Sequence, residues 1–205
     1  MTTAFQYIFD NAESISINKR PITSQTISRD LTVRSISRGG QIWRFDVSLP
    51  NGMAWDIARP FIEAIEFAGR STEGTIQINN SGYNNWLTNY RGDCSTTSGF
   101  DAVVVNGSNV ITLDSNPSIS SGNKLAIGDI IQLGSGHVYS VVENTRFDSN
   151  IVTLNRSVLD ATGSYTVLIG PDVTWNVICV GLPNWTIMSR NQVSWSGPFN
   201  FYEVV

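Results

Sequence analysis

The sequence predicts a mainly β protein, built from a β-sandwich-like domain with one helix and a small β-barrel inserted into it. Charged residues make up only 15% of the chain, below the roughly 25% of typical soluble domains. Asn, Ser, Thr and Gly supply most of the polar residues, which favours strands joined by turns. Several short segments alternate apolar and polar residues, the period of a strand with one buried face.

The first residues of the chain predict a pair of strands over residues 5–17. Phe5, Tyr7 and Phe9 recur at every second position, and two isoleucines alternate with serines after a short polar turn. A further short strand is expected at residues 74–79.

A hairpin over residues 27–49 is the predicted centre of the fold. Its second arm alternates four apolar residues, Trp43, Phe45, Val47 and Leu49, with polar ones. The first arm has its own apolar residues, and two adjacent glycines in the turn at residues 37–41 allow a tight reversal. We therefore expect these two arms to pair with each other.

One helix is predicted over about residues 53–68. Its apolar positions form a single stripe, made of Ile57, Phe61, Ile65 and Ala68. Pro60 either lies in the first turn of a helix that begins near Asp56 or kinks a longer helix. Gly69 is the expected C-cap.

The domain organisation follows from a change in composition. All six tryptophans lie outside residues 94–171. That segment contains short aliphatic strands separated by turn signals, which predicts a small barrel or sandwich; the strands are expected at residues 102–105, 110–113, 129–133, 138–143, 151–154 and 165–169. We expect residues 1–93 and 172–205 to form one discontinuous domain with 94–171 inserted; two consecutive domains are the alternative.

Catalytic, metal and cofactor motifs are not evident in the sequence, so we expect neither an enzyme nor a cofactor. His137 is the only histidine, which leaves too few ligands for a zinc site. It follows a Gly-Ser-Gly that lacks the strand–turn–helix context of a hydrolase nucleophile. Cys94 and Cys179 fit no metal spacing, and we expect both to be reduced core residues.

The surroundings of the protein are constrained by similar arguments. The net charge of −4 argues against a general attraction to nucleic acid. No apolar run reaches the length of a membrane span, and the N-terminus has no signal-peptide pattern, so we expect synthesis in the cytosol.

Basic residues are concentrated in one region. Six of them lie between Lys19 and Arg44, where Asp30 is the one acidic residue. This region is either a solvated strand edge protected against aggregation or a patch that faces a neighbouring subunit. The second interpretation gives the candidate interface residues, which are Arg29, Arg34, Arg38 and Arg44. Charge reversal at Arg38 and Arg44 should then reduce assembly without unfolding the monomer.

Four strings of residues stand out along the chain. They are Tyr7-Ile8-Phe9-Asp10-Asn11, Ser37-Arg38-Gly39-Gly40-Gln41-Ile42-Trp43-Arg44-Phe45, Tyr83-Asn84-Asn85-Trp86-Leu87 with Asn89-Tyr90, and Gly128-Asp129-Ile130-Ile131-Gln132-Leu133 with His137-Val138-Tyr139. In these strings the sequence resembles the distal tail proteins of long-tailed bacteriophages. The resemblance implies a structural virion protein with an OB-like barrel that faces outward. It also implies a homohexameric ring joining the tail tube to the tail tip or baseplate hub, assembled in the host cytoplasm.

The partners implied by this resemblance are other copies of the chain, the tail tube protein and the hub or tip protein. Together with the charge and motif arguments above, we expect no cofactor, no membrane and no sequence-specific nucleic acid, and a weak contact with host glycans stays open. The alternative function is a carbohydrate-binding module that attaches to a cell surface, and the third class considered is a hydrolase. A glycan array on the inserted segment would separate the first two.

Overall fold

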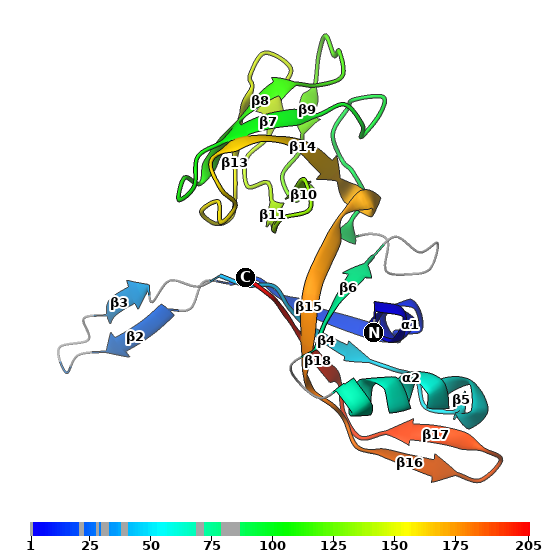
Figure 1. Ribbon diagram of the computed structural model, residues 1–205. Helices are drawn as coiled ribbons and strands as arrows, with labels where there is room; N and C mark the ends of the chain where they lie inside the picture. Colours follow the sequence, from blue (N-terminus) through cyan, green and yellow to red (C-terminus); the bar gives the residue numbers. More distant parts are fainter. Residues whose placement is uncertain are drawn as a thin grey trace. The chain divides into compact units, whose positions relative to one another are not determined.

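The computed structural model describes most of the chain (Figure 1). The described residues are 2–20, 23–27, 29, 33–37, 41–68, 72–78 and 87–205. The fold is mainly β and consistent with a β-sandwich plus a small barrel. The chain divides into two compact units, Met1–Gly74 with Asn176–Val204 and Thr75–Trp175 with Val205. The sequence prediction had placed the boundaries at residues 94 and 171.

The sheet of the first unit has five strands in the order β1-β4-β18-β15-β6, and the unit boundaries fall within β6 and β15. These strands are β1 (Ser14–Asn18), β4 (Arg44–Ser48), β18 (Phe199–Glu203), β15 (Thr174–Gly181) and β6 (Glu73–Gln77). β4 lies between β1 and β18 and pairs antiparallel with both. Trp43, Phe45, Val47 and Leu49 are buried, so the predicted alternation along this strand is confirmed.

The predicted hairpin over residues 27–49 is wrong. Its first arm belongs to β3 (Val33–Ser37), which pairs antiparallel with β2 (Thr23–Ile27). Its second arm is β4, whose two edges are taken by β1 and β18. β2 and β3 therefore form a separate two-stranded sheet, in which Ile27 ends the first strand.

The predicted strand at residues 5–9 is also wrong, because α1 (Thr2–Asp10) occupies this segment. The buried residues are Ala4, Phe5, Ile8 and Phe9, which is a helical spacing. The ring of Phe5 packs on that of Phe201 at 5.2 Å, and the ring of Phe9 packs on that of Phe45 at 5.6 Å. Aromatic packing against the sheet therefore favours the helix. The strand predicted after the turn is confirmed as β1.

The fold contains a second helix, α2 (Trp55–Ala68), where the sequence predicted one. Pro60 lies inside it, and Gly69 lies outside the described residues. The predicted buried stripe is displaced, because Ala58, Ile62 and Ile65 are buried whereas Ile57 is 58% exposed. Beside α2, a three-stranded sheet contains β5 (Met53–Ala54), β16 (Trp185–Met188) and β17 (Gln192–Trp195).

The second unit is a small barrel. Its six-stranded sheet has the order β11-β10-β14-β7-β8-β13, and the hydrogen bonds Val142 N→Thr153 O and Asn155 N→Ser140 O join its two ends. The strands are β7 (Asp101–Val104), β8 (Val110–Ser115), β10 (Ile130–Leu133), β11 (Val138–Ser140), β13 (Ile151–Thr153) and β14 (Gly163–Ile169). All six overlap strands that the sequence predicted. The sheet has one strand more than the five-stranded barrel of an OB-fold.

The remaining elements of this unit complete the barrel. β9 (Asn123–Leu125) and β12 (Thr145–Arg146) form a two-stranded sheet that the sequence analysis missed, and a short 3-10 helix, η3 (Gly170–Asp172), follows β14. The core is aliphatic with Phe100 and Tyr139 at its centre, both fully buried.

Candidate functional site

The β2–β3 hairpin is the first candidate surface. Within the described part of the chain, β2 and β3 pair with each other and with no other strand. An isolated two-stranded hairpin is marginally stable in water. Ile27, at the end of β2, is 68% exposed. The hairpin therefore presents main-chain edges and at least one apolar side chain that another chain could cover.

The two ends of this hairpin are held side by side by the rest of the first unit. Asn18 at the end of β1 lies opposite Arg44 at the start of β4. The side-chain amide of Gln41 donates a hydrogen bond to the carbonyl of Lys19 at 2.6 Å. The ammonium of Lys19 lies 5.1 Å from the centre of the Trp43 ring, and partial burial lowers the pKa of this lysine. The segment before the hairpin and the segment after it are therefore held next to each other at the edge of the sheet.

Of the four predicted interface arginines, the structure describes the side chains of two, Arg29 and Arg44. Arg29 lies in the turn between β2 and β3 and is exposed. Arg34 belongs to β3 but its side chain lies outside the described part, and Arg38 lies wholly outside it.

Arg44 is engaged within its own chain. Its Nε lies 3.0 Å from Asp46 Oδ1 in the same strand, and its guanidinium lies 5.4 Å from the centre of the Tyr202 ring. The hydrogen bond and the charge of Asp46 raise the pKa of Arg44. Among the four, Arg29 is the arginine whose side chain is described and exposed in the hairpin.

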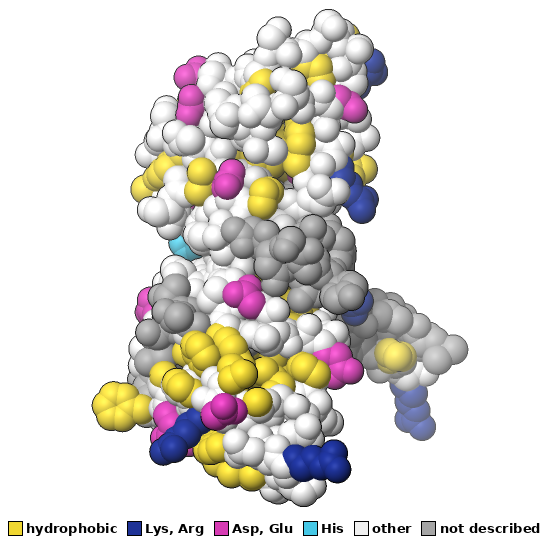
Figure 2. Space-filling model, turned by 90° about the vertical axis from the view of Figure 1, so that its right-hand side faces the viewer, with side chains coloured by type: hydrophobic (Ala, Val, Ile, Leu, Met, Phe, Trp, Pro, Cys, Tyr) yellow, Lys and Arg dark blue, Asp and Glu magenta, His cyan; other side chains and the backbone are white. Residues whose placement is uncertain are grey.

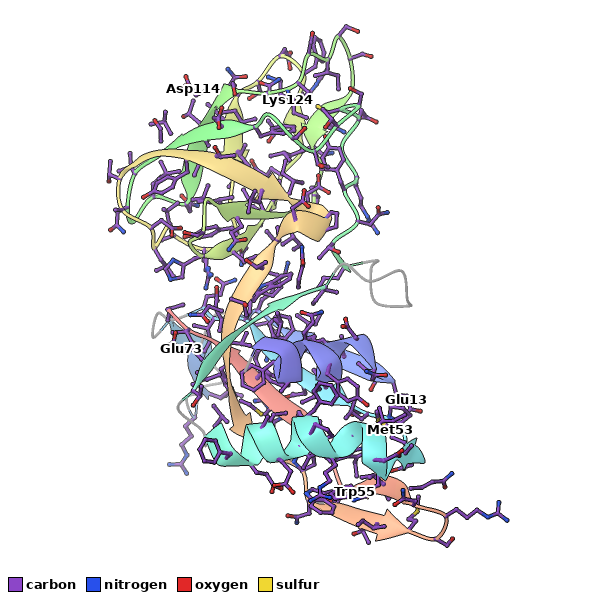
Figure 3. All side chains as sticks on the ribbon, turned by 45° about the vertical axis from the view of Figure 1, so that its right-hand side comes forward. Glu13, Met53, Trp55, Glu73, Asp114 and Lys124 are labelled. Atoms are coloured by element: carbon purple, nitrogen blue, oxygen red, sulfur yellow. The ribbon has the colours of Figure 1, made fainter. Side chains whose placement is uncertain are left out.

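The outer face of α2 is a second candidate surface, which the sequence analysis missed. Ile57 and Phe67 are 58% and 94% exposed, and Pro60 between them is exposed as well. Trp55, the first residue of α2 (Figure 3), stacks on Trp185 of β16 at 4.7 Å between ring centres. Trp185 Nε1 donates a hydrogen bond to Glu66 at 2.9 Å. The signal in the sequence was the i, i+3, i+10 spacing of the three exposed apolar residues.

The histidine lies in a hydrogen-bonded group of the barrel. His137 Nδ1 and its backbone N–H both lie 3.1 Å from Asp160 Oδ1, and Tyr139 donates to Asp160 Oδ2 at 2.6 Å. Asp160 is largely buried, and Tyr139 is fully buried. An imidazole oriented by a carboxylate can serve as a general base when a nucleophile hydrogen-bonds to it. The contacts described for His137 include no hydroxyl or thiol. The bonds to Asp160 link β11 to the loop before β14.

The described residues hold no group of three or more His, Cys, Asp and Glu side chains that could bind a metal ion. Cys94 and Cys179 are both buried, as expected for core residues. No described helix is long and apolar enough to cross a membrane.

Comparison with known proteins gives no family for this chain. No protein-family model matches the sequence, and no curated protein is significantly similar to it.

Proposed function

We propose that this chain is a structural protein of a bacteriophage tail. In this proposal, copies of the chain assemble into a ring that joins the tail tube to the tail tip or baseplate hub, with the barrel facing outward. The partners are other copies of the chain, most simply six, together with the tube protein and the hub or tip protein.

The observation that carries the proposal is the β2–β3 hairpin. Its strands have no other strand as neighbour in the described part of the chain, and its described side chains Ile27 and Arg29 are exposed. Strand edges and apolar side chains that one chain leaves uncovered are suited to contact with a second chain. The resemblance of several strings of the sequence to distal tail proteins supports a tail ring among such assemblies.

The experiment measures the mass of the purified full chain by sedimentation velocity. We expect a species of about six times the 22.5 kDa mass of one chain. A variant in which a short Gly-Ser linker replaces residues 21–40 should sediment as a folded monomer, because Asn18 and Arg44 hold the linker ends together. A monomeric wild-type chain at every concentration, or an assembly that survives removal of the hairpin, would contradict the proposal.

Two single substitutions refine this test. Arg29→Glu changes an exposed charge in the hairpin turn, and Arg44→Glu changes one already paired with Asp46 inside the chain. Arg29→Glu should weaken assembly more than Arg44→Glu, with unchanged circular dichroism for both. The opposite order would place the interface near Arg44 on β4 and would contradict a contact through the hairpin turn.

A further inference from the structure

The helix α2 has apolar side chains on two faces, and one of these faces is exposed to solvent. Ala58, Ile62 and Ile65 face the core and are buried. A second stripe, formed by Ile57, Pro60, Ala64 and Phe67, follows the i, i+3, i+7, i+10 spacing of one helix face. Phe67 is 94% exposed and Ile57 is 58% exposed. Exposed apolar side chains grouped in this way mark a protein interface more often than single exposed residues do.

The edge of this stripe is acidic. Asp56, Glu63 and Glu66 are all exposed on α2, against one basic residue, Arg59. Figure 2 shows hydrophobic side chains grouped at the surface in the lower part of the view, with acidic and basic side chains near them. The outer face of α2 therefore combines an apolar stripe with a net negative charge, which selects a partner that is apolar and basic.

The β2–β3 hairpin has this complementary character. Residues 23–37, which span the hairpin, contain two basic residues, Arg29 and Arg34, and one acidic residue, Asp30. Three more basic residues flank the hairpin in the sequence, at positions 19, 20 and 38. The described part of the hairpin exposes an apolar side chain, Ile27, next to a basic one, Arg29. Both surfaces therefore expose apolar side chains, and their charges have opposite signs.

We propose that the outer face of α2 receives the β2–β3 hairpin of a neighbouring copy of the chain. Ile27 then packs on the stripe around Phe67, and Arg29 lies beside Glu63, one helical turn away. Because the two surfaces differ, the contact is head-to-tail, and repetition of such a contact closes a ring when the rotation permits. This inference rests on the proposed assembly and identifies the surface that accepts the hairpin.

A cysteine cross-link tests the contact directly, since both native cysteines are buried. The chains Ile27→Cys and Phe67→Cys are mixed and oxidised, and the products are separated on a non-reducing gel. We expect a cross-linked dimer from the mixture and a ladder of multimers from the chain that carries both substitutions. The control pairs Ile27→Cys with Ile127→Cys, an exposed apolar position in a turn of the barrel, and should give no dimer.

Association measurements give an independent readout. Phe67→Glu should raise the dissociation constant of the assembly by roughly tenfold to a hundredfold, as loss of a buried phenylalanine predicts, whereas Ile127→Glu should not change it. Arg29→Glu and Glu63→Arg should each weaken assembly about threefold, and the chain with both should recover most of the loss.

The outcomes separate this inference from the proposed function. A wild-type chain that assembles while Phe67→Glu assembles equally well would overturn the α2 contact and leave the ring standing. A cross-link that forms only inside the doubly substituted chain, with none in the mixture, would also overturn it. A wild-type chain that never assembles would overturn both.

Discussion

Removal of Asp160 should destabilise the barrel selectively. Its carboxylate accepts hydrogen bonds from the Tyr139 hydroxyl at 2.6 Å and from the backbone N–H of His137 at 3.1 Å. The Tyr139 hydroxyl in turn accepts the backbone N–H of Leu159 at 2.9 Å. The carboxylate therefore joins the β11 segment to the loop that precedes β14.

The magnitude follows from these contacts. A hydrogen bond to a charged group contributes about 1.5–3 kcal/mol, and an unsatisfied buried donor costs about 1–3 kcal/mol. We expect Asp160→Ala to lower the free energy of unfolding of the barrel by about 4 kcal/mol. Tyr139→Phe, which leaves the bonds from His137 in place, should lower it by about 2 kcal/mol. Because the two residues share a bond, the double variant should lose about 2 kcal/mol less than the sum.

The assay is hydrogen exchange with mass spectrometry in increasing urea, read on peptides from residues 94–171. A local readout is needed because a chain with two units does not have one defined unfolding free energy. Phe45→Ala is the matched control, since Phe45 is fully buried in β4 of the first unit. Its loss of about 3–5 kcal/mol should appear in peptides from that unit. An Asp160→Ala barrel that loses less than about 1 kcal/mol, or strictly additive losses, would refute the reasoning.

Two further predictions concern the same unit. A Cβ at Gly136 would overlap Asp160 Oδ1, so Gly136→Ala should lower the free energy of unfolding of the barrel by about 2–3 kcal/mol in the same exchange assay. Gly163→Ala is the control, because a Cβ there has its nearest contact at 3.7 Å and should change this free energy little. Equal effects of the two substitutions would contradict this prediction. Burial raises the pKa of Tyr139 and of Tyr90, so their contribution to stability is complete below pH about 10 and should fall as the pH rises above it. Alkaline unfolding followed by circular dichroism checks this, and Tyr139→Phe should make the pH dependence shallower; an unchanged slope would contradict it.

The barrel strands could be predicted because their signals are local. Each of the six combines a short aliphatic run with a turn sequence next to it. The buried face of β4 was predictable for the same reason, because strict alternation fixes which side chains share a face.

Partner choice and periodicity explain the errors in the first unit. Nothing in residues 27–49 specifies that β4 pairs with β1 and β18, the second of which is supplied from the far end of the chain. Residues 2–10 fit both a strand and a helix, and the packing of Phe5 and Phe9 on the sheet decides between them.

The candidate sites were harder to predict than the fold. An outward apolar stripe on α2 cannot be told from a core stripe until the orientation of the helix is known, and the sequence analysis assigned Ile57 to the buried face. The bond between Tyr139 and Asp160 joins residues separated by a loop and two strands. By contrast, the concentration of basic residues near Arg29 was visible in the sequence alone.

Electron microscopy of the purified full chain tests the central claim, self-association through the β2–β3 hairpin, most directly. The account predicts closed rings with rotational symmetry, and their complete loss when a short linker replaces residues 21–40. Rings of the same size from the linker variant would contradict the claim, as would single separate chains from the wild-type protein.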